Sequence, residues 1–158
     1  QSFEKIILNS ELQNNFKLLN DLSNYFGSQA ITVSIDVDYS FLNIPYVAFK
    51  GGINKSKISP LKWSKMCSLN GAGEIMITSI KNEGTWKGYD IELIKQISKE
   101  VNTPVIANGG AGSINDLKNI LNFTDVTAAA ASSLFLFQKK GMGVLVNFPN
   151  VDVPKIQL

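Results

Sequence analysis

The chain lacks two residue types on which enzymes often depend. None of its 158 residues is histidine, and all 15 basic residues are lysine, so arginine is absent as well. Without histidine the commonest general base and metal ligand is missing, and without arginine no bidentate guanidinium clamp can hold a phosphate. A single cysteine, Cys67, excludes an intrachain disulfide and a zinc site. We therefore expect no metal and no cofactor, and a reducing, cytoplasmic location.

Charge and hydropathy exclude two further classes of protein. The formal net charge of +2 is too small to indicate a nucleic-acid partner. No apolar run reaches the length of about 18 residues that a membrane span needs. With 44% hydrophobic and 18% charged residues, the composition is that of a globular domain with a core.

Apolar strands and amphipathic helices alternate along the chain. Strands are expected at 5–10, 30–36, 74–80, 103–110 and 126–131, with a hairpin strand at 46–49 turning at Gly51-Gly52. Helices are expected from Ser10 to Gly27, at 59–71, from Asp90 to Val101, from Ser113 to Leu121, and briefly from Ser132. Short, continuously apolar strands that alternate with helices indicate a parallel sheet.

Two α/β architectures fit this order, an open doubly wound sheet and part of a (β/α) barrel. No G-x-G-x-x-G follows the first strand, which weakens a dinucleotide-binding interpretation. A complete barrel needs eight strand–helix units and typically about 250 residues. The chain has about five units, so a barrel would be incomplete.

Small and polar residues follow the expected strands, where both architectures place their chemistry. These residues are Asn9, Ser10, Asp36, Asp38, Thr78, Ser79, Asn108, Gly109, Gly110, Ser132 and Ser133. The stretches "NGGAGS" (108–113) and "ASS" (131–133) each offer backbone N–H groups close to a helix start, where an anion is favoured. Together they predict one phosphate cup, although glycines in tight turns alone would also explain them. Ser10 could equally be only a helix cap.

Asp36 is the acid best placed for general acid/base work, because it ends an apolar strand. The alternative is a solvated loop acid, which suits Asp38 better because it lies further into the expected loop. At the opposite strand ends, Lys5 and Glu74 each precede an apolar strand. They could form an ordinary surface ion pair, or part of a charged ring at a barrel floor.

Four stretches, "FGSQAITVSID", "NGAGEIMITSIKNEGTWKGYD", "TPVIANGGAG" and "ASSLFLF", together resemble the cyclase subunit (HisF) of imidazole glycerol phosphate synthase over about residues 4–137. The resemblance implies a ribulose-phosphate-binding (β/α)8 TIM barrel. Residues 1–158 would be the C-terminal part of that single domain, with strands four to eight.

The resemblance also implies an activity in histidine biosynthesis, an amino-acid biosynthesis pathway. The family's cyclase, a lyase, takes ammonia from a glutaminase (HisH-like) subunit of the same glutamine amidotransferase. With it the cyclase splits a bis-phosphate ribulosyl carboxamide nucleotide, which gives imidazole glycerol phosphate. Asp36 matches one of two acid/base aspartates, and the other lies on a first strand outside this sequence, so this chain alone is expected to be inactive.

The remaining implied site residues follow the family's motifs position by position. Asn9 and Ser10 match one phosphate site, Thr78 and Ser79 match a substrate-facing pair, and Lys5 and Glu74 match an ammonia gate. The other phosphate- and substrate-binding residues are Gly84, Gly109, Gly110, Ser132 and Ser133.

Two segments depart from the family's pattern. The loop 81–85 reads Lys-Asn-Glu-Gly-Thr where the family usually has Asp-Arg-Asp-Gly-Thr, and residues 141–149 look like the ending of a paralogous group in surface-glycan pathways. One alternative is therefore a barrel that supplies ammonia to a sugar amidotransferase. Another is a non-catalytic fragment that binds phosphates or docks a glutaminase. Because an incomplete barrel exposes apolar edges, self-association is also expected.

Overall fold

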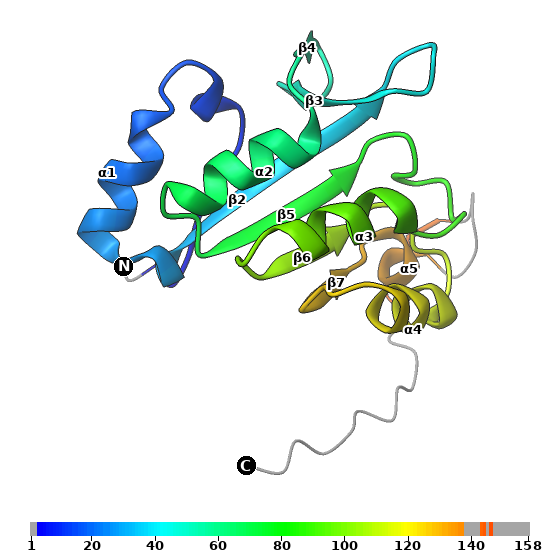
Figure 1. Ribbon diagram of the computed structural model, residues 1–158. Helices are drawn as coiled ribbons and strands as arrows, with labels where there is room; N and C mark the ends of the chain where they lie inside the picture. Colours follow the sequence, from blue (N-terminus) through cyan, green and yellow to red (C-terminus); the bar gives the residue numbers. More distant parts are fainter. Residues whose placement is uncertain (1–2, 138–142, 145, 147–158) are drawn as a thin grey trace.

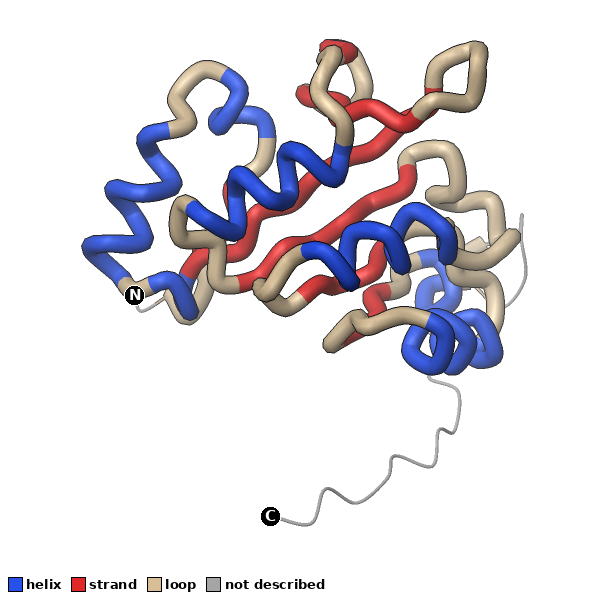
Figure 2. The backbone as a smooth tube through the Cα atoms, in the orientation of Figure 1, coloured by secondary structure: helices blue, strands red, loops and turns tan. Residues whose placement is uncertain are grey.

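The parallel strands follow one another across a single sheet in chain order. The computed structural model describes residues 3–137, 143, 144 and 146, so the ending at 141–149 lies largely outside the described residues. Strands β1 (Ile6–Leu8), β2 (Ile31–Tyr39), β5 (Glu74–Ser79), β6 (Val105–Asn108) and β7 (Ala128–Ala130) pair in parallel in that order. Strands β3 (Pro45–Phe49) and β4 (Asn54–Lys55) form an antiparallel hairpin beside β2. Figure 2 shows this sheet in red.

This strand order separates the two architectures left open by the sequence. A doubly wound sheet reverses its strand order at a switch point, whereas a barrel wall adds each strand beside the last. The described sheet does the second and stays open, with β1 and β7 at opposite ends. The fold is therefore the wall of an incomplete (β/α) barrel.

Helices connect the strands and mostly begin at the expected caps. They are α1 (Lys17–Phe26), α2 (Pro60–Leu69), α3 (Ile91–Glu100), α4 (Ile114–Phe123) and α5 (Ser133–Leu136), with short 3-10 helices η1 (Ser10–Gln13) and η2 (Ser28–Ala30). The side chains of Ser59, Asp90 and Ser113 each accept the backbone N–H three residues later, which confirms three predicted caps. Among the described helices, none is long and apolar enough to cross a membrane.

The segment after β1 differs from the expected single helix. Residues Ser10–Gln13 form the 3-10 helix η1, and α1 begins only at Lys17. Ser10 caps neither helix, because its Oγ donates to Asn9 Oδ1 at 3.2 Å and accepts the Lys50 amide at 2.6 Å. The prediction of a capping role for Ser10 is therefore wrong, and the β3–β4 hairpin takes that oxygen instead.

The two faces of the sheet have opposite character. On β2 and β5 the side chains of Val33, Ile35, Ile75 and Ile77 are at most 1% exposed. Figure 1 shows α2 and α3 lying across these strands. The alternate positions, which lie on the other face, include Thr32, Ser34, Asp36, Glu74, Met76, Thr78, Ile106 and Asn108. Polar side chains thus share one face, with charges near its amino edge and the candidate site near its carboxyl edge.

Candidate functional site

Both acids of the stretch "IDVDY" lie inside strand β2 rather than beyond its end. Strand β2 continues to Tyr39 because β3 pairs with its last four residues, with Asp36 opposite Ala48 and Asp38 opposite Tyr46. The prediction that Asp38 lies in a loop is therefore wrong. The hairpin supplies backbone partners that the local sequence does not reveal.

The environments of the two acids differ. The Asp38 carboxylate accepts the Tyr46 hydroxyl at 3.0 Å and the Tyr39 amide at 2.8 Å. These bonds hold the hairpin to β2, so Asp38 has a structural role. The half-buried Asp36 carboxylate instead accepts the side-chain amide of Asn9 at 3.2 Å, across to the end of β1. The Asp36 side chain is thus oriented by Asn9 rather than by the hairpin.

A row of polar side chains crosses the sheet at the level of Asp36. Asp36 pairs with Thr78 on β5, and Thr78 pairs with Asn108 on β6. The Asn108 Nδ2 donates to the Thr78 Oγ1 at 3.1 Å. The row connects Asn9, at the end of β1, with Asn108, at the end of β6.

Ser79 does not belong to this row. Its side chain is fully buried and alternates with Thr78, so it lies on the helix-covered face with Ile75 and Ile77. Among the described residues its Oγ has no hydrogen-bond partner. The prediction that Thr78 and Ser79 face one substrate is therefore wrong for Ser79, since neighbouring strand residues point to opposite faces.

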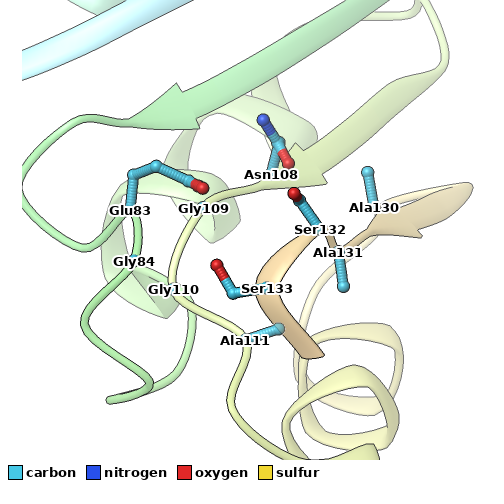
Figure 3. Close-up of a pocket in the computed structure, with 10 residues that line it drawn as sticks. All are labelled: Glu83, Gly84, Asn108, Gly109, Gly110, Ala111, Ala130, Ala131, Ser132 and Ser133. Atoms are coloured by element: carbon cyan, nitrogen blue, oxygen red, sulfur yellow. The ribbon is translucent and has the colours of Figure 1, made fainter. Parts of the chain in front are cut away.

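A hollow lies at the carboxyl ends of β6 and β7, with three loops around it (Figure 3). It spans about 200 Å³ including its solvent-open part, which is less than the roughly 300 Å³ of the smallest drug-sized pockets. Its lining residues are Glu83, Gly84, Asn108, Gly109, Gly110, Ala111, Ala130, Ala131, Ser132 and Ser133. Five predicted binding residues, Gly84, Gly109, Gly110, Ser132 and Ser133, are thus brought together.

Two glycines let the loops around the hollow approach one another. Gly110 has φ +104°, and a Cβ built there would lie 2.2 Å from the Gly88 carbonyl oxygen. The Gly88 amide in turn donates to the Gly110 carbonyl at 2.8 Å. A Cβ on Gly109 would lie 2.9 Å from the Ser79 carbonyl oxygen. The hollow therefore requires glycine at both positions.

The start of helix α4 does not face an open anion site, contrary to one part of the prediction. The Asp116 Oδ2 accepts the amides of Gly112 and Ser113, at 3.0 Å and 2.8 Å, in a capping box. The spacing Ser-x-x-Asp in the sequence could have revealed this cap. Any anion at this turn must use the earlier residues 108–111.

Glu83 is a lining residue that the sequence-based prediction missed. A Cβ built on Gly109 would lie 3.3 Å from its Oε2, so this carboxylate reaches over the glycine turn, as Figure 3 shows. Burial raises the pKa of Tyr89 to about 12, and the charges of Asp116 and Glu83 contribute. The protonated Tyr89 hydroxyl donates to the Ala130 carbonyl at 2.8 Å, which fixes the end of β7 beside the hollow.

Lys5 and Glu74 meet at the amino edge of the sheet. The Lys5 Nζ lies 2.8 Å from the Glu74 Oε1, and the Thr32 hydroxyl donates to the Glu74 Oε2 at 2.9 Å. The hydrogen bond from Lys5 is the main cause that lowers the pKa of Glu74. Burial opposes this shift, and the hydrogen bond from Thr32 adds to it. The pair thus spans β2, with its two ends on β1 and β5. At neither edge do the described residues contain a group of three or more His, Cys, Asp or Glu side chains suited to a metal.

The strand order and the parallel pairing define the wall of an incomplete (β/α) barrel. The chain belongs to the histidine biosynthesis protein family, whose model matches residues 1–140. It is 39% identical over 149 residues to a Pseudomonas aeruginosa protein named "Putative imidazole glycerol phosphate synthase subunit hisF2", covering 94% of this chain and 59% of that protein.

Relatives in two other organisms carry the HisF name without a qualifier. The Leuconostoc mesenteroides imidazole glycerol phosphate synthase subunit HisF is 41% identical, with 85% of this chain and 53% of that protein covered. The Sulfolobus acidocaldarius subunit HisF is 44% identical, with 80% and 51% covered. The chain therefore spans little more than half the length of these curated relatives.

Proposed function

We propose that this chain is the carboxyl-terminal part of an ammonia-using synthase subunit of the HisF type. Its substrate would be a bis-phosphate ribulosyl carboxamide nucleotide and its product imidazole glycerol phosphate. The observation that carries the proposal is the hollow, where predicted residues from three separate loops converge. It lies at the same sheet edge as Asp36, joined to it by the row through Thr78 and Asn108.

One phosphate of the substrate would occupy the hollow. The Ser132 and Ser133 hydroxyls line it and make no hydrogen bond within the part of the chain that the structure describes, so both can donate to phosphate oxygens. Because these donors need no arginine, the lysine-only composition is compatible with the proposal. The other phosphate would bind near Asn9 and Ser10.

Asp36 would serve as the acid/base group of this half of the barrel. Asn9 holds one of its carboxylate oxygens at 3.2 Å, which orients the side chain on the polar face. A second titratable group is needed to complete acid/base catalysis, and the family resemblance assigns it to a strand outside this sequence. The chain supplies one half of the pair.

Ammonia would enter at the opposite edge of the sheet, from a glutaminase partner. The Lys5–Glu74 pair lies there, with Thr32 fixing the second Glu74 oxygen. Partially exposed side chains held by one ion pair can separate at low cost, as a gate requires.

The test is an assay of this chain, completed by the amino-terminal half of the barrel that carries the second titratable group, with the carboxamide nucleotide and an ammonium salt. Asp36→Asn should abolish turnover, while Asp38→Asn, a matched change two residues along β2, should retain most of it if the protein stays folded. Turnover that survives Asp36→Asn would remove Asp36 from the mechanism. Failure of this completed, unmodified barrel to turn over the nucleotide would contradict the proposed substrate.

A second candidate function keeps the ammonia channel and changes the acceptor to a sugar amidotransferase of surface-glycan synthesis. It is favoured by Lys81, which donates to Asn43 Oδ1 at 3.2 Å and lies 4.9 Å from the centre of the Tyr39 ring, away from the hollow. The family's usual acid is thus replaced by a cation with other contacts. Stimulation of a partner glutaminase without nucleotide turnover would support this candidate.

A further inference from the structure

The turn between β2 and β3 presents apolar side chains to solvent. Phe41 is fully exposed, and Leu42 and Ile44 are 74% and 58% exposed. Figure 1 shows this turn projecting beyond the carboxyl end of β2, at the edge that carries the candidate site. Single exposed apolar residues are ordinary, but several gathered on one short turn are typical of an interaction site. Residues 40–44 are called the apolar tip below.

Hydrogen bonds hold the apolar tip in one conformation. The Ser40 amide donates to the Ile44 carbonyl at 2.9 Å, and the Ser40 Oγ accepts the Ile44 amide at 3.1 Å. Asn43, with φ +58°, donates its amide to the Ser40 carbonyl at 2.9 Å, and its Oδ1 accepts the Lys81 Nζ at 3.2 Å. Because the backbone is already ordered, a partner that binds here loses little affinity to the ordering of the loop.

The hairpin that follows the apolar tip is basic. Residues 39–73 contain five lysines and no aspartate or glutamate, so the rest of the chain has a net charge of −3 within the total of +2. Lys50, Lys55 and Lys57 belong to the β3–β4 hairpin and the segment directly after it. All three are exposed, and none forms an ion pair among the described residues. The surface next to the tip therefore favours a negatively charged partner.

Toward α3 the apolar tip borders acids instead. Asn43 lines a hollow together with Asp90 and Glu92, at the start of α3. The Asp90 carboxylate already accepts the Tyr39 hydroxyl and the Leu93 amide. An acidic partner is thus favoured over the hairpin and disfavoured over α3, which gives the surface a direction.

Two simpler occupants do not account for this surface. The rest of the barrel, which the proposed function places outside this sequence, would continue the sheet at β1 and β7. The tip follows β2, which already pairs with β1, β3 and β5. In a symmetric pair of copies joined through the tip, the lysines of both hairpins would face one another, which is unfavourable. A separate protein with acidic side chains avoids both difficulties.

We propose that the apolar tip and the lysines of the β3–β4 hairpin dock a separate protein through an acidic segment that also carries apolar side chains. Phe41 and Leu42 would pack among those apolar side chains, and Lys50 and Lys57 would pair with the carboxylates. Burial of the tip would supply most of the affinity, and the charges would set the orientation. The docked protein would stand at the carboxyl edge, beside the candidate site. The inference goes beyond the proposed function and does not depend on the substrate, because the tip does not line the hollow at β6 and β7.

The test uses the barrel completed by its amino-terminal half, because open sheet ends would bind apolar peptides without specificity. Fluorescence anisotropy compares a labelled peptide of Glu, Leu and Ala with a peptide in which Lys replaces each Glu. The acidic peptide should bind on the order of tenfold more tightly, and high salt should reduce this preference. Phe41→Ser combined with Leu42→Ser should weaken the acidic peptide by at least about tenfold. Lys50→Gln combined with Lys57→Gln should weaken it roughly threefold.

Matched changes elsewhere serve as controls. Leu69→Ser replaces another exposed leucine, at the end of α2, and Lys99→Gln combined with Lys118→Gln removes two exposed lysines from α3 and α4. Both should leave the affinity for the acidic peptide unchanged, and circular dichroism should show that every variant is folded. Equal affinity for the two peptides, no binding of the acidic peptide, or unchanged affinity in the Phe41→Ser and Leu42→Ser variant would overturn the inference.

The same variants distinguish two other occupants. Binding to vesicles of phosphatidylserine and phosphatidylcholine that is lost with Phe41→Ser and Leu42→Ser, without binding of the acidic peptide, would assign the tip to a membrane surface. A dimer in size-exclusion chromatography that only this variant dissociates would assign the tip to a second copy. Either result would overturn the proposal of an acidic protein partner.

Discussion

Two clusters at the carboxyl edge of the sheet are the proposed phosphate sites, and their hydrogen bonding differs. In the hollow at β6 and β7, the Ser132 and Ser133 hydroxyls have no hydrogen-bond partner among the described residues. At the end of β1, the Ser10 hydroxyl already contacts Asn9 and the Lys50 amide. The first cluster is open to a ligand, and the second must exchange internal bonds for it.

Two clusters whose residues both match the family's motifs are therefore not equivalent as binding sites. A ligand at Asn9 and Ser10 competes with the β3–β4 hairpin and with the Asn9–Asp36 bond at 3.2 Å. A ligand in the hollow breaks no hydrogen bond of the Ser132 or Ser133 hydroxyl among the described residues. We therefore expect the hollow to bind inorganic phosphate more tightly than the Asn9–Ser10 cluster, and the following variants test this order.

The largest effect is expected from Gly110→Ala. The new Cβ would lie 2.2 Å from the Gly88 carbonyl oxygen, and φ is +104° there, so the loop must move and the hollow is lost. We expect phosphate binding in the hollow to disappear and unfolding free energy to fall by about 1–3 kcal/mol. Calorimetry and urea unfolding measure the two effects.

Gly51→Ala is the matched control for this variant. Gly51 also has a positive φ, +64°, but a Cβ there meets no atom within 4 Å. Both variants pay the backbone cost, and Gly110→Ala alone adds the clash. Equal losses of phosphate affinity in the two variants would mean that the hollow does not depend on the Gly88–Gly110 approach.

Local patterns predicted the element types and the caps at Ser59, Asp90 and Ser113, because hydrophobic period and capping chemistry act over a few residues. They failed where a distant segment intervenes. The extension of β2 to Tyr39 depends on the hairpin strand β3, and the orientation of Ser10 depends on Lys50.

The candidate site also has residues that local patterns predict and residues whose position depends on distant segments. The glycines and serines of the hollow could be predicted from the ends of successive strands, since parallel strands bring their ends to one edge. The place of Glu83 could not, because it depends on the turn conformation after β5 and on the space above Gly109. Ser79 was misplaced although strand alternation alone predicts its burial.

The next effect in size is expected from the pair Ser132→Ala and Ser133→Ala. Each change removes one hydrogen bond to a charged phosphate, worth about 1.5–3 kcal/mol, so phosphate affinity in the hollow should fall roughly tenfold to a hundredfold for each. Stability should stay nearly constant, because neither hydroxyl is bonded within the described chain. Calorimetry with inorganic phosphate and a thermal melt separate the two results. A loss of stability without a loss of affinity would contradict the open state of the hollow.

Ser10→Ala should show the reverse pattern. It leaves the Lys50 amide without its 2.6 Å acceptor and should lower the free energy of unfolding by about 1 kcal/mol. The tighter phosphate site should be unchanged, while a weaker second site, if titrated at higher phosphate, should disappear. Ser56→Ala, which removes another hydroxyl acceptor of a backbone amide, is the control for general hairpin loosening. Loss of the tighter site in Ser10→Ala would reverse the order of the two clusters.

The smallest effect is expected at the opposite edge, where both partners are charged but partly exposed. The lowered pKa of Glu74 means that its ionised form stabilises the fold at neutral pH, and this contribution is lost as pH falls from the ordinary value of 4.5 through the folded-state pKa. With side chains 43% and 30% exposed, the Lys5–Glu74 pair should contribute less than about 1 kcal/mol. Lys5→Met should therefore lower the free energy of unfolding slightly at pH 7, and by progressively less as pH falls below 4.5, as measured by urea unfolding. An equal loss at neutral and acidic pH would show that the contribution of Lys5 does not depend on the ionised Glu74 carboxylate.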